Sequence, residues 1–203
     1  MLLLDDDSLR RKIREAKGVV FEGAQGVLLD EQYGFHPHTT WSRCTAAGAL
    51  ELAGDRSVRR LGVTRAYTTR HGAGPFPTED PTMHLPELHN PDGHAGRFRV
   101  GALDLMLLRY ALRAAPMDEL AVTCLDRVGA TPVVGVAYEG RDDLELPRTL
   151  QEAETLGQQL HQVQPVWSHC EDLVAVVEER TGIPVVLTAH GPTPNDRQWR
   201  TNS

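Results

Sequence analysis

The sequence contains few lysines and few cysteines. Its only lysines are Lys12 and Lys17, and no Gly-x-x-x-x-Gly-Lys-Ser/Thr motif occurs, so the common glycine-lysine loop for nucleotide phosphates is absent. The three cysteines, Cys44, Cys124 and Cys170, lie far apart without a Cys-x-x-Cys pair, which argues against a disulfide framework and a cysteine-framed zinc site. We therefore expect a reducing compartment and a cytoplasmic location.

Positive charge and long apolar runs are also scarce. The formal net charge is -7, without the basic stretch that a polyanion requires, so we expect no nucleic-acid partner. No segment approaches the roughly 18 apolar residues of a membrane helix, and "MLLLDDD" lacks the basic start of a signal peptide, so we expect no membrane partner. With 40% hydrophobic residues among 203, the chain can bury a core, and we expect a single domain over residues 1–203.

The hydrophobic pattern alternates between helical and extended segments. Helical spacing predicts helices over residues 8–17, 43–53, 100–114, 150–160 and 168–182. Apolar, β-favouring runs predict strands over residues 19–21, 61–68, 119–125, 131–138 and 183–192. This alternation predicts an α/β fold, a mostly parallel sheet with flanking helices.

Polar residues follow several of these predicted strands. Gln25 follows the first, Arg70 the second and Asp126 the third, and residues 188–191 end the last. Ligands of α/β proteins gather at the carboxyl ends of strands, which makes these residues candidates for a binding site. A lone polar residue at a strand end is more often a cap or a solvated side chain, and from position alone this alternative remains open.

Five segments resemble adenylosuccinate synthetase, the enzyme that joins IMP to aspartate with GTP, in their order and approximate spacing. They lie between Gly18 and Arg197 and read FEGAQGVLLD, YGFHPHTTWSRCTAAGA, RAYTTRHGAGPFPTE, VTCLD and GIPVVLTAHGPTPNDR. The resemblance implies the later part of that fold, which is related to the P-loop NTPases, and a role in purine nucleotide (AMP) biosynthesis.

The resemblance implies an IMP site. Gln25 matches the glutamine that contacts hypoxanthine, and an amide offers a purine edge both a donor and an acceptor. Thr40 matches the threonine that binds the IMP phosphate. Arg70 and Gly72 belong to the stretch beside the substrate pocket, where glycines let the backbone pass close to a ligand.

Sites for aspartate and GTP are implied in the same way. Arg97 and Arg99 resemble the arginine-rich loop that holds the carboxylate of aspartate, a task that suits the planar guanidinium. Asp126 matches the aspartate that accepts N–H bonds from guanine, while Thr188 and Gly191 lie in the segment that packs on this base.

The sequence also departs from the family pattern. The family's glycine-rich phosphate loop, catalytic aspartate, Mg2+ site and catalytic histidine would precede Met1, so we expect an N-terminally truncated chain and name no catalytic residue and no metal ligand. Cys124 stands where a lysine usually precedes the guanine-reading aspartate, and His71 replaces an apolar residue.

These departures leave several functions open. We expect a GTP-dependent ligase that is inactive as an isolated chain and needs a homodimer or a separate chain to supply the N-terminal half. The alternatives are a catalytically inactive purine-nucleotide-binding or regulatory paralogue, and a folded remnant that binds nothing.

Two other chemistries are minor alternatives. His84, His89 and His94 recur at five-residue intervals and could form a metal site, although histidine-rich loops without acid or cysteine partners at ligand spacing are usually only polar loops. Cys44 or Cys170 beside a histidine could act as a nucleophile, but no nucleophile elbow or third supporting group accompanies them.

Overall fold

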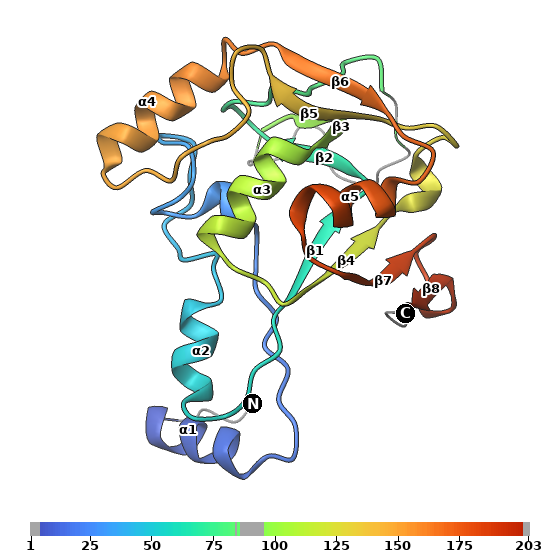
Figure 1. Cartoon of the computed structure of the whole chain (residues 1–203). Helices are drawn as coiled ribbons and strands as arrows, with labels where there is room; N and C mark the ends of the chain where they lie inside the picture. Colours follow the sequence, from blue (N-terminus) through green and yellow to red (C-terminus); the bar gives the residue numbers. More distant parts are fainter. Residues whose placement is uncertain (1–4, 84, 86–95, 201–203) are drawn as a thin grey trace.

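The computed structural model, which describes residues 5–83, 85 and 96–200, contains two four-stranded sheets with helices beside them (Figure 1). The first sheet has the order β1-β4-β7-β8, formed by β1 (Leu61–Arg65), β4 (Glu119–Thr123), β7 (Val185–Ala189) and β8 (Arg197–Trp199). The second has the order β2-β3-β5-β6, formed by β2 (Tyr67–His71), β3 (Phe98–Asp104), β5 (Val133–Tyr138) and β6 (Pro165–His169).

Four of the five α-helices of the described residues follow a residue whose side chain caps the first turn. The helices are α1 (Asp6–Glu15), α2 (Ala47–Ala53), α3 (Leu105–Ala114), α4 (Leu150–Leu160) and α5 (Leu173–Thr181), with short 3-10 turns η1 (Val27–Leu29), η2 (Leu125–Arg127) and η3 (Pro194–Asp196). The side chains of Asp5, Asp104, Thr149 and Asp172 each accept a hydrogen bond from a backbone N–H of the helix that follows, whereas α2 follows Ala46 without such a cap. These bonds satisfy N–H groups that the helix itself leaves unpaired.

Helices α1 and α2 form an arm that extends away from the two sheets (Figure 1). Arg56 holds the arm together, because its Nη1 donates to the carbonyls of Ile13 and Arg14, each at 3.1 Å, at the end of α1. Arg10 and Glu51 add an exposed ion pair between the two helices, 3.4 Å apart, which contributes little on its own.

Two hydrophobic clusters form the core. The first lies between the first sheet and helices α3 and α5, and includes Leu105, Leu120, Val122, Val177 and Val185. The second cluster contains residues of α3, α4 and β5 together with Phe35 from the loop between η1 and α2. Its members include Met106, Tyr110, Tyr138 and Leu160. Helix α3 contributes to both clusters and so joins the two sheets.

The predicted α/β class with flanking helices is confirmed, and its parallel pairing is concentrated in the first sheet. There β1 pairs with β4 and β4 with β7 in parallel, while β8 is antiparallel to β7. In the second sheet only β3 and β5 are parallel, and β2 and β6 pair antiparallel at the edges.

Several predicted elements are corrected by the structure. Residues 19–21 form no strand, and Val20 is 94% exposed. The helix predicted over residues 100–114 is strand β3 up to Asp104 and helix α3 after it. The strand predicted over residues 61–68 is divided at Ala66 into β1 and β2, which belong to different sheets. Within the described part of the chain, no helix is long and apolar enough to cross a membrane.

Candidate functional site

A cluster of polar side chains joins Gln25 to Thr40. The hydroxyl of Ser42 lies 3.2 Å from Gln25 Oε1 and 3.5 Å from Thr40 Oγ1. The thiol of Cys44 lies 3.5 Å from the same amide oxygen of Gln25. The structure therefore brings together the amide and the hydroxyl that the resemblance assigns to one nucleotide, and it adds two side chains between them.

The backbone at Gln25 adopts an uncommon conformation. Its φ angle is +61°, in the left-handed region, which costs a residue other than glycine about 1 to 2 kcal/mol. Such residues gather at binding sites, where the surrounding structure maintains the strained conformation. Gln25 is exposed, and a Cβ at the nearby Gly23 or Gly26 would meet no atom within 4 Å, so this segment is open to solvent.

Asp30 fixes the loop that carries Thr40 and Ser42. Its carboxylate is 1% exposed and accepts three backbone hydrogen bonds, from Gln32 and Tyr33 at 2.8 and 3.1 Å and from Cys44 at 2.6 Å. These bonds tie the start of the loop to its end. Asp30 was not predicted from the sequence, although an aspartate directly before a turn is a known signal for such side-chain to backbone bonds.

Arg70 links this loop to the glycine-rich stretch after β2. Its side chain is buried, with Nε donating to the carbonyl of Ala73 at 2.9 Å and Nη2 donating to the carbonyl of His38 at 3.0 Å. Burial, and secondarily the charge of Arg99, lower the pKa of Arg70 to about 10, so it remains charged at neutral pH. In the structure, Arg70 positions the His38 loop by binding two backbone carbonyls.

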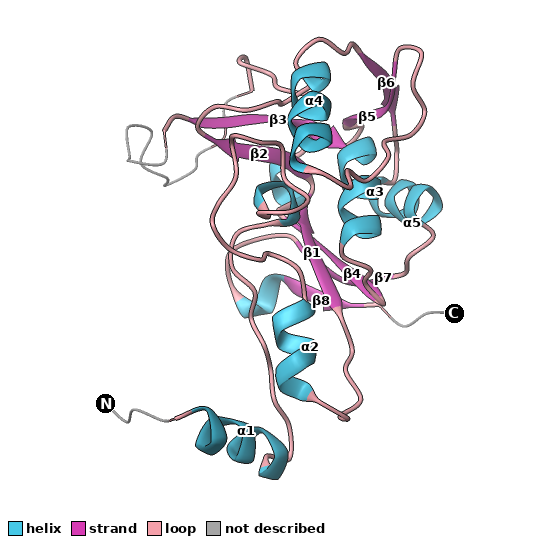
Figure 2. Cartoon of the chain, turned by 90° about the vertical axis from the view of Figure 1, so that its left-hand side faces the viewer, coloured by secondary structure: helices cyan, strands magenta, loops and turns pink. Residues whose placement is uncertain are grey.

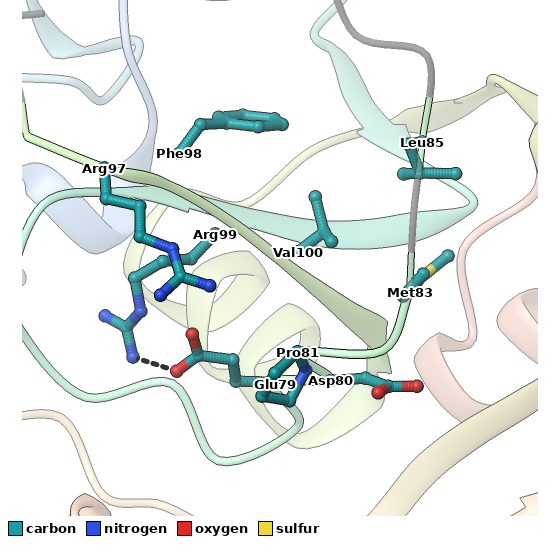
Figure 3. A pocket seen from close by; sticks show the side chains of 9 residues that line it. All are labelled: Glu79, Asp80, Pro81, Met83, Leu85, Arg97, Phe98, Arg99 and Val100. Carbon is teal, nitrogen blue, oxygen red and sulfur yellow. Dashed lines mark hydrogen bonds and ion pairs between the residues drawn. The ribbon is translucent and has the colours of Figure 1, made fainter. Parts of the chain in front are cut away.

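The two predicted aspartate-binding arginines have different surroundings (Figure 3). Arg99 Nη1 donates to the carbonyls of Gly72 and Gly74 at 3.1 and 2.9 Å, and its Nη2 lies 2.5 Å from Glu79 Oε2. The bond from Arg99 is the main reason that the pKa of Glu79 is lowered. The side chain of Arg97 is exposed, and its guanidinium also points toward Glu79. Arg97 is therefore the more accessible cation of the pair.

A small pocket lies beside these arginines. It has a volume of about 190 Å³, and Glu79, Asp80, Met83 and Phe98 are among the residues that line it together with Arg97 and Arg99. Figure 3 shows both guanidinium groups and the Glu79 carboxylate facing one another, with Met83 and Leu85 on the opposite side. The pocket thus combines charged and apolar side chains, with Arg97, Arg99 and Glu79 together and Asp80 lying toward Met83.

The predicted guanine residues lie at the ends of two neighbouring strands, with one exception. Asp126 follows β4 in η2, with its Oδ2 2.9 Å from Arg127 Nε, and Gly191 follows β7. Because β4 and β7 are adjacent and parallel, both positions lie at one edge of the sheet. Thr188 is the exception, because it lies within β7 and is buried.

The loop after β7 is closed by Asp196. Its carboxylate accepts bonds from the backbone N–H and the hydroxyl of Thr193, at 2.8 and 2.6 Å, and the N–H of His190 donates to its carbonyl at 2.9 Å. The bonds from Thr193 lower the pKa of Asp196. A Cβ at Gly191 would lie 2.7 Å from the Asp196 carboxyl group, so this loop requires glycine there.

The described residues contain no cluster of side chains from which a metal-dependent catalytic step could be derived. Among them, no three His, Cys, Asp or Glu side chains gather in a way that could hold a metal ion. His84, His89 and His94 lie outside the described residues. Cys170 is buried, which raises the pKa of its thiol and makes it a poor nucleophile.

Two sheets with flanking helices, and polar loops at the carboxyl ends of β4 and β7, define a mixed α/β protein. Residues 2–197 match the family model of adenylosuccinate synthetase, and the chain belongs to this family. It is 36% identical to adenylosuccinate synthetase of Thermomicrobium roseum, over 91% of this chain and 48% of that protein. It is 38% identical to adenylosuccinate synthetase of Thermus thermophilus, over 93% of this chain and 50% of that protein.

A solved structure shares the fold. Fully ligated adenylosuccinate synthetase from Plasmodium falciparum superimposes with a TM-score of 0.68 at 21% identity, covering 89% of this chain and 49% of that one. The chain therefore spans about half the length of the relatives and the structure that it matches.

Proposed function

We propose that this chain binds IMP and serves the formation of adenylosuccinate in purine nucleotide synthesis. The observation that carries the proposal is the cluster of Gln25, Ser42 and Thr40 in a member of this family. The left-handed backbone at Gln25 supports it, because strain of this kind is retained where a side chain must point at a ligand.

Each residue of the proposed IMP site has a defined task. The amide of Gln25 offers a donor and an acceptor to the hypoxanthine edge, and the hydroxyl of Thr40 donates to a phosphate oxygen. Asp30 and Arg70 do not contact IMP in this proposal. They hold the Thr40 loop in one conformation before the ligand arrives, which reduces the ordering cost of binding.

The proposal extends to guanine, with GTP as the co-substrate. The carboxylate of Asp126 forms an ion pair with Arg127 through Oδ2, and the Asp126 side chain is 31% exposed, which leaves an oxygen accessible to the N–H donors of guanine. Gly191 forms the closed loop at the neighbouring strand end. Thr188 is buried within β7, so in this proposal it supports the structure at the carboxyl ends of β4 and β7.

Catalysis requires more than these residues provide. Phosphoryl transfer depends on groups that clamp the phosphates, and the two lysines of the chain lie at α1 and just after it. The proposed ligase activity therefore needs a polypeptide segment outside these 203 residues that supplies the phosphate clamp and the Mg2+ ligands. Cys124, in place of the family's lysine, favours a second candidate function, a nucleotide-binding or regulatory paralogue without catalysis.

The purified 203-residue chain should be titrated with IMP and assayed with IMP, aspartate, GTP and Mg2+. We expect IMP binding and turnover far below about 1 s⁻¹, a typical lower value for enzymes. Turnover at or above that rate by the pure chain would contradict the need for an added phosphate clamp. Absence of IMP binding would contradict the proposed function itself.

A further inference from the structure

Two side chains of the following loop hold the amide oxygen of Gln25. Ser42 Oγ donates to Gln25 Oε1 at 3.2 Å, and the thiol of Cys44 donates to the same oxygen at 3.5 Å. An amide oxygen has two lone pairs, and the amide nitrogen carries two N–H donors. The two hydrogen bonds therefore occupy the acceptor side of Gln25 and leave its N–H donors for a ligand.

Backbone hydrogen bonds keep both donors beside Gln25. The segment between α1 and α2 that carries them contains only the short turn η1 and is otherwise loop (Figure 2). The carbonyl of Ser42 accepts from the N–H of Glu31 at 3.2 Å, and the N–H of Cys44 donates to the Asp30 carboxylate at 2.6 Å. The loop is thus fixed by bonds that do not involve the Ser42 hydroxyl or the Cys44 thiol.

The opposite orientation of the Gln25 amide is less favourable at this position. Rotation by 180° would place Nε2 beside Ser42 and Cys44 and would turn the oxygen outward. The hydroxyl of Ser42 can accept a bond from Nε2, but the sulfur of Cys44 is only a weak acceptor, and its thiol would lose the amide oxygen as a partner. Together, the hydroxyl and the thiol favour an amide whose N–H groups point outward.

The substituent at position 6 of a purine decides which amide orientation a nucleotide requires. Hypoxanthine, like guanine, carries an oxygen there that accepts hydrogen bonds, whereas adenine carries an amino group that donates them. The outward N–H groups of Gln25 can pair with the oxygen, but they meet the amino group donor to donor. A freely rotating amide would turn its oxygen outward and accept from adenine, as amide side chains do elsewhere.

We propose that Ser42 and Cys44 are positioning residues that make the site selective for 6-oxopurine over 6-aminopurine nucleotides, because they hold the Gln25 amide with its N–H groups outward. This selectivity rests on the proposed IMP site and goes beyond it, since neither the hydroxyl of Ser42 nor the thiol of Cys44 contacts the base. The selectivity arises mainly from the penalty on an adenine nucleotide, whose amino group faces an unpaired donor.

Competition calorimetry measures this selectivity at the IMP site. The 203-residue chain is loaded with IMP, which is then displaced by AMP or by xanthosine monophosphate, a nucleotide that also carries an oxygen at position 6. In the double variant Ser42→Ala/Cys44→Ala, we expect the affinity for AMP relative to IMP to rise about fivefold or more, because the amide can rotate. The affinity for xanthosine monophosphate relative to IMP should stay the same.

Two further variants separate the proposed role from a loss of local structure. Cys44→Ser keeps an O–H donor beside Gln25 and should retain the parent's ratio of AMP to IMP affinity, whereas Cys44→Ala should raise this ratio by about twofold. Ser57→Ala, at an exposed position in the loop after α2, should leave both ratios unchanged. Because the backbone bonds of the loop are retained, all variants should keep the parent's thermal midpoint.

The two ratios distinguish failure of this proposal from failure of the proposed function. If the parent binds IMP and the double variant has the parent's ratio of AMP to IMP affinity, Ser42 and Cys44 do not set the selectivity and the proposal is overturned. Equal changes in the ratios for AMP and xanthosine monophosphate would also overturn it, since they indicate a disturbed loop. Absence of IMP binding by the parent would contradict the proposed function and this selectivity together.

Discussion

The guanidinium of Arg70 occupies the space that a side chain at position 74 would need. A Cβ at Gly74 would collide with Nη2 of Arg70 and lie 2.6 Å from its Cζ, and the φ angle of Gly74 is +112°. The glycine-rich stretch after β2 therefore has a physical reason, since its backbone folds closely over a buried arginine. That arginine in turn holds the loop of His38, next to Thr40.

Gly74→Ala should destabilise the protein by about 2 to 4 kcal/mol, because it adds a collision with a buried group to a strained backbone. Gly140→Ala is the matched control. Its φ is +69°, but no atom lies within 4 Å of the added Cβ, so it should cost only about 1 to 2 kcal/mol. Denaturant unfolding of both variants measures the difference, and equal losses would show that Arg70 moves away without cost.

Substitution of Arg99, which lies in β3, and of Arg97, which directly precedes this strand, should have different effects. Arg99→Ala removes three hydrogen bonds and leaves two carbonyls and Glu79 without their partner, so we expect a loss of about 2 to 4 kcal/mol in the free energy of unfolding. Arg97→Ala should change stability by less than about 0.5 kcal/mol, as for other exposed positions. Calorimetry with aspartate in the presence of IMP should instead show weaker binding for Arg97→Ala, and unchanged binding would remove Arg97 from the aspartate site.

Asp104 should make stability depend on pH. Its buried carboxylate caps α3 by accepting from the N–H of Leu107 at 3.0 Å, and it accepts from the Tyr138 hydroxyl at 2.9 Å. Burial raises the pKa of Asp104 to about 6 from an ordinary value of 3.8. The folded protein thus binds a proton more tightly than the unfolded chain. This stabilisation is fully present below about pH 4 and is lost as pH rises through about 6, a change of about 3 kcal/mol.

Asp104→Asn should remove this dependence while keeping an oxygen that caps the helix. Between about pH 4 and 7, the free energy of unfolding of the parent should fall with rising pH relative to that of Asp104→Asn. Asp172→Asn, at the exposed N-cap of α5, is the control and should leave the slope of the parent intact. A variant as pH-dependent as the parent would show that Asp104 does not titrate in this range.

Local signals in the sequence predicted much of the fold. Helices α1, α2, α4 and α5 and strands β4, β5 and β7 lie within or close to the predicted ranges, because capping residues and apolar periodicity determine them. The short edge strands β6 and β8 were missed, since their existence depends on distant partners in β5 and β7.

The segment from Val100 to Leu108 shows why one element was misread. Apart from Asp104 it lacks polar side chains, because its strand and its helix are both largely buried, and a nearly continuous apolar run fits either periodicity. Asp104 was the available signal, as an N-cap residue in the middle of the run. Residues 19–21 are of types that favour a strand, but no strand among the described residues lies beside them to pair with.

The site was only partly predictable. The resemblance identified Gln25 and Thr40, which the structure joins through Ser42. It did not indicate that Arg70 and Arg99 bind backbone carbonyls, because such bonds depend on how the loops pack against each other. Asp30 was missed although two of its bonds are local, and only its bond to Cys44 depends on how the loop packs.

Asp126→Asn should abolish the preference for guanine over adenine nucleotides. A carboxylate accepts two N–H bonds from guanine, whereas an asparagine offers only one acceptor. We expect the parent to bind GTP and GDP weakly and equally, with ATP weaker by about tenfold, and the variant to bind all three alike. Glu139→Gln, at an exposed carboxylate beyond β5, serves as the control in the same titrations. Strong preference for GTP over GDP would reveal a phosphate site among residues to which no such role is assigned.

Calorimetric titration of the 203-residue chain with IMP, beside Gln25→Ala and the exposed control Gln162→Ala, tests the central claim most directly. The account predicts that the parent and Gln162→Ala bind IMP with the same affinity. Gln25→Ala should bind more weakly by about 1 to 3 kcal/mol, because the polar edge of the bound base would lose its hydrogen-bond partner. A parent that binds no IMP, or a Gln25→Ala variant with unchanged affinity, would contradict the assignment of this site.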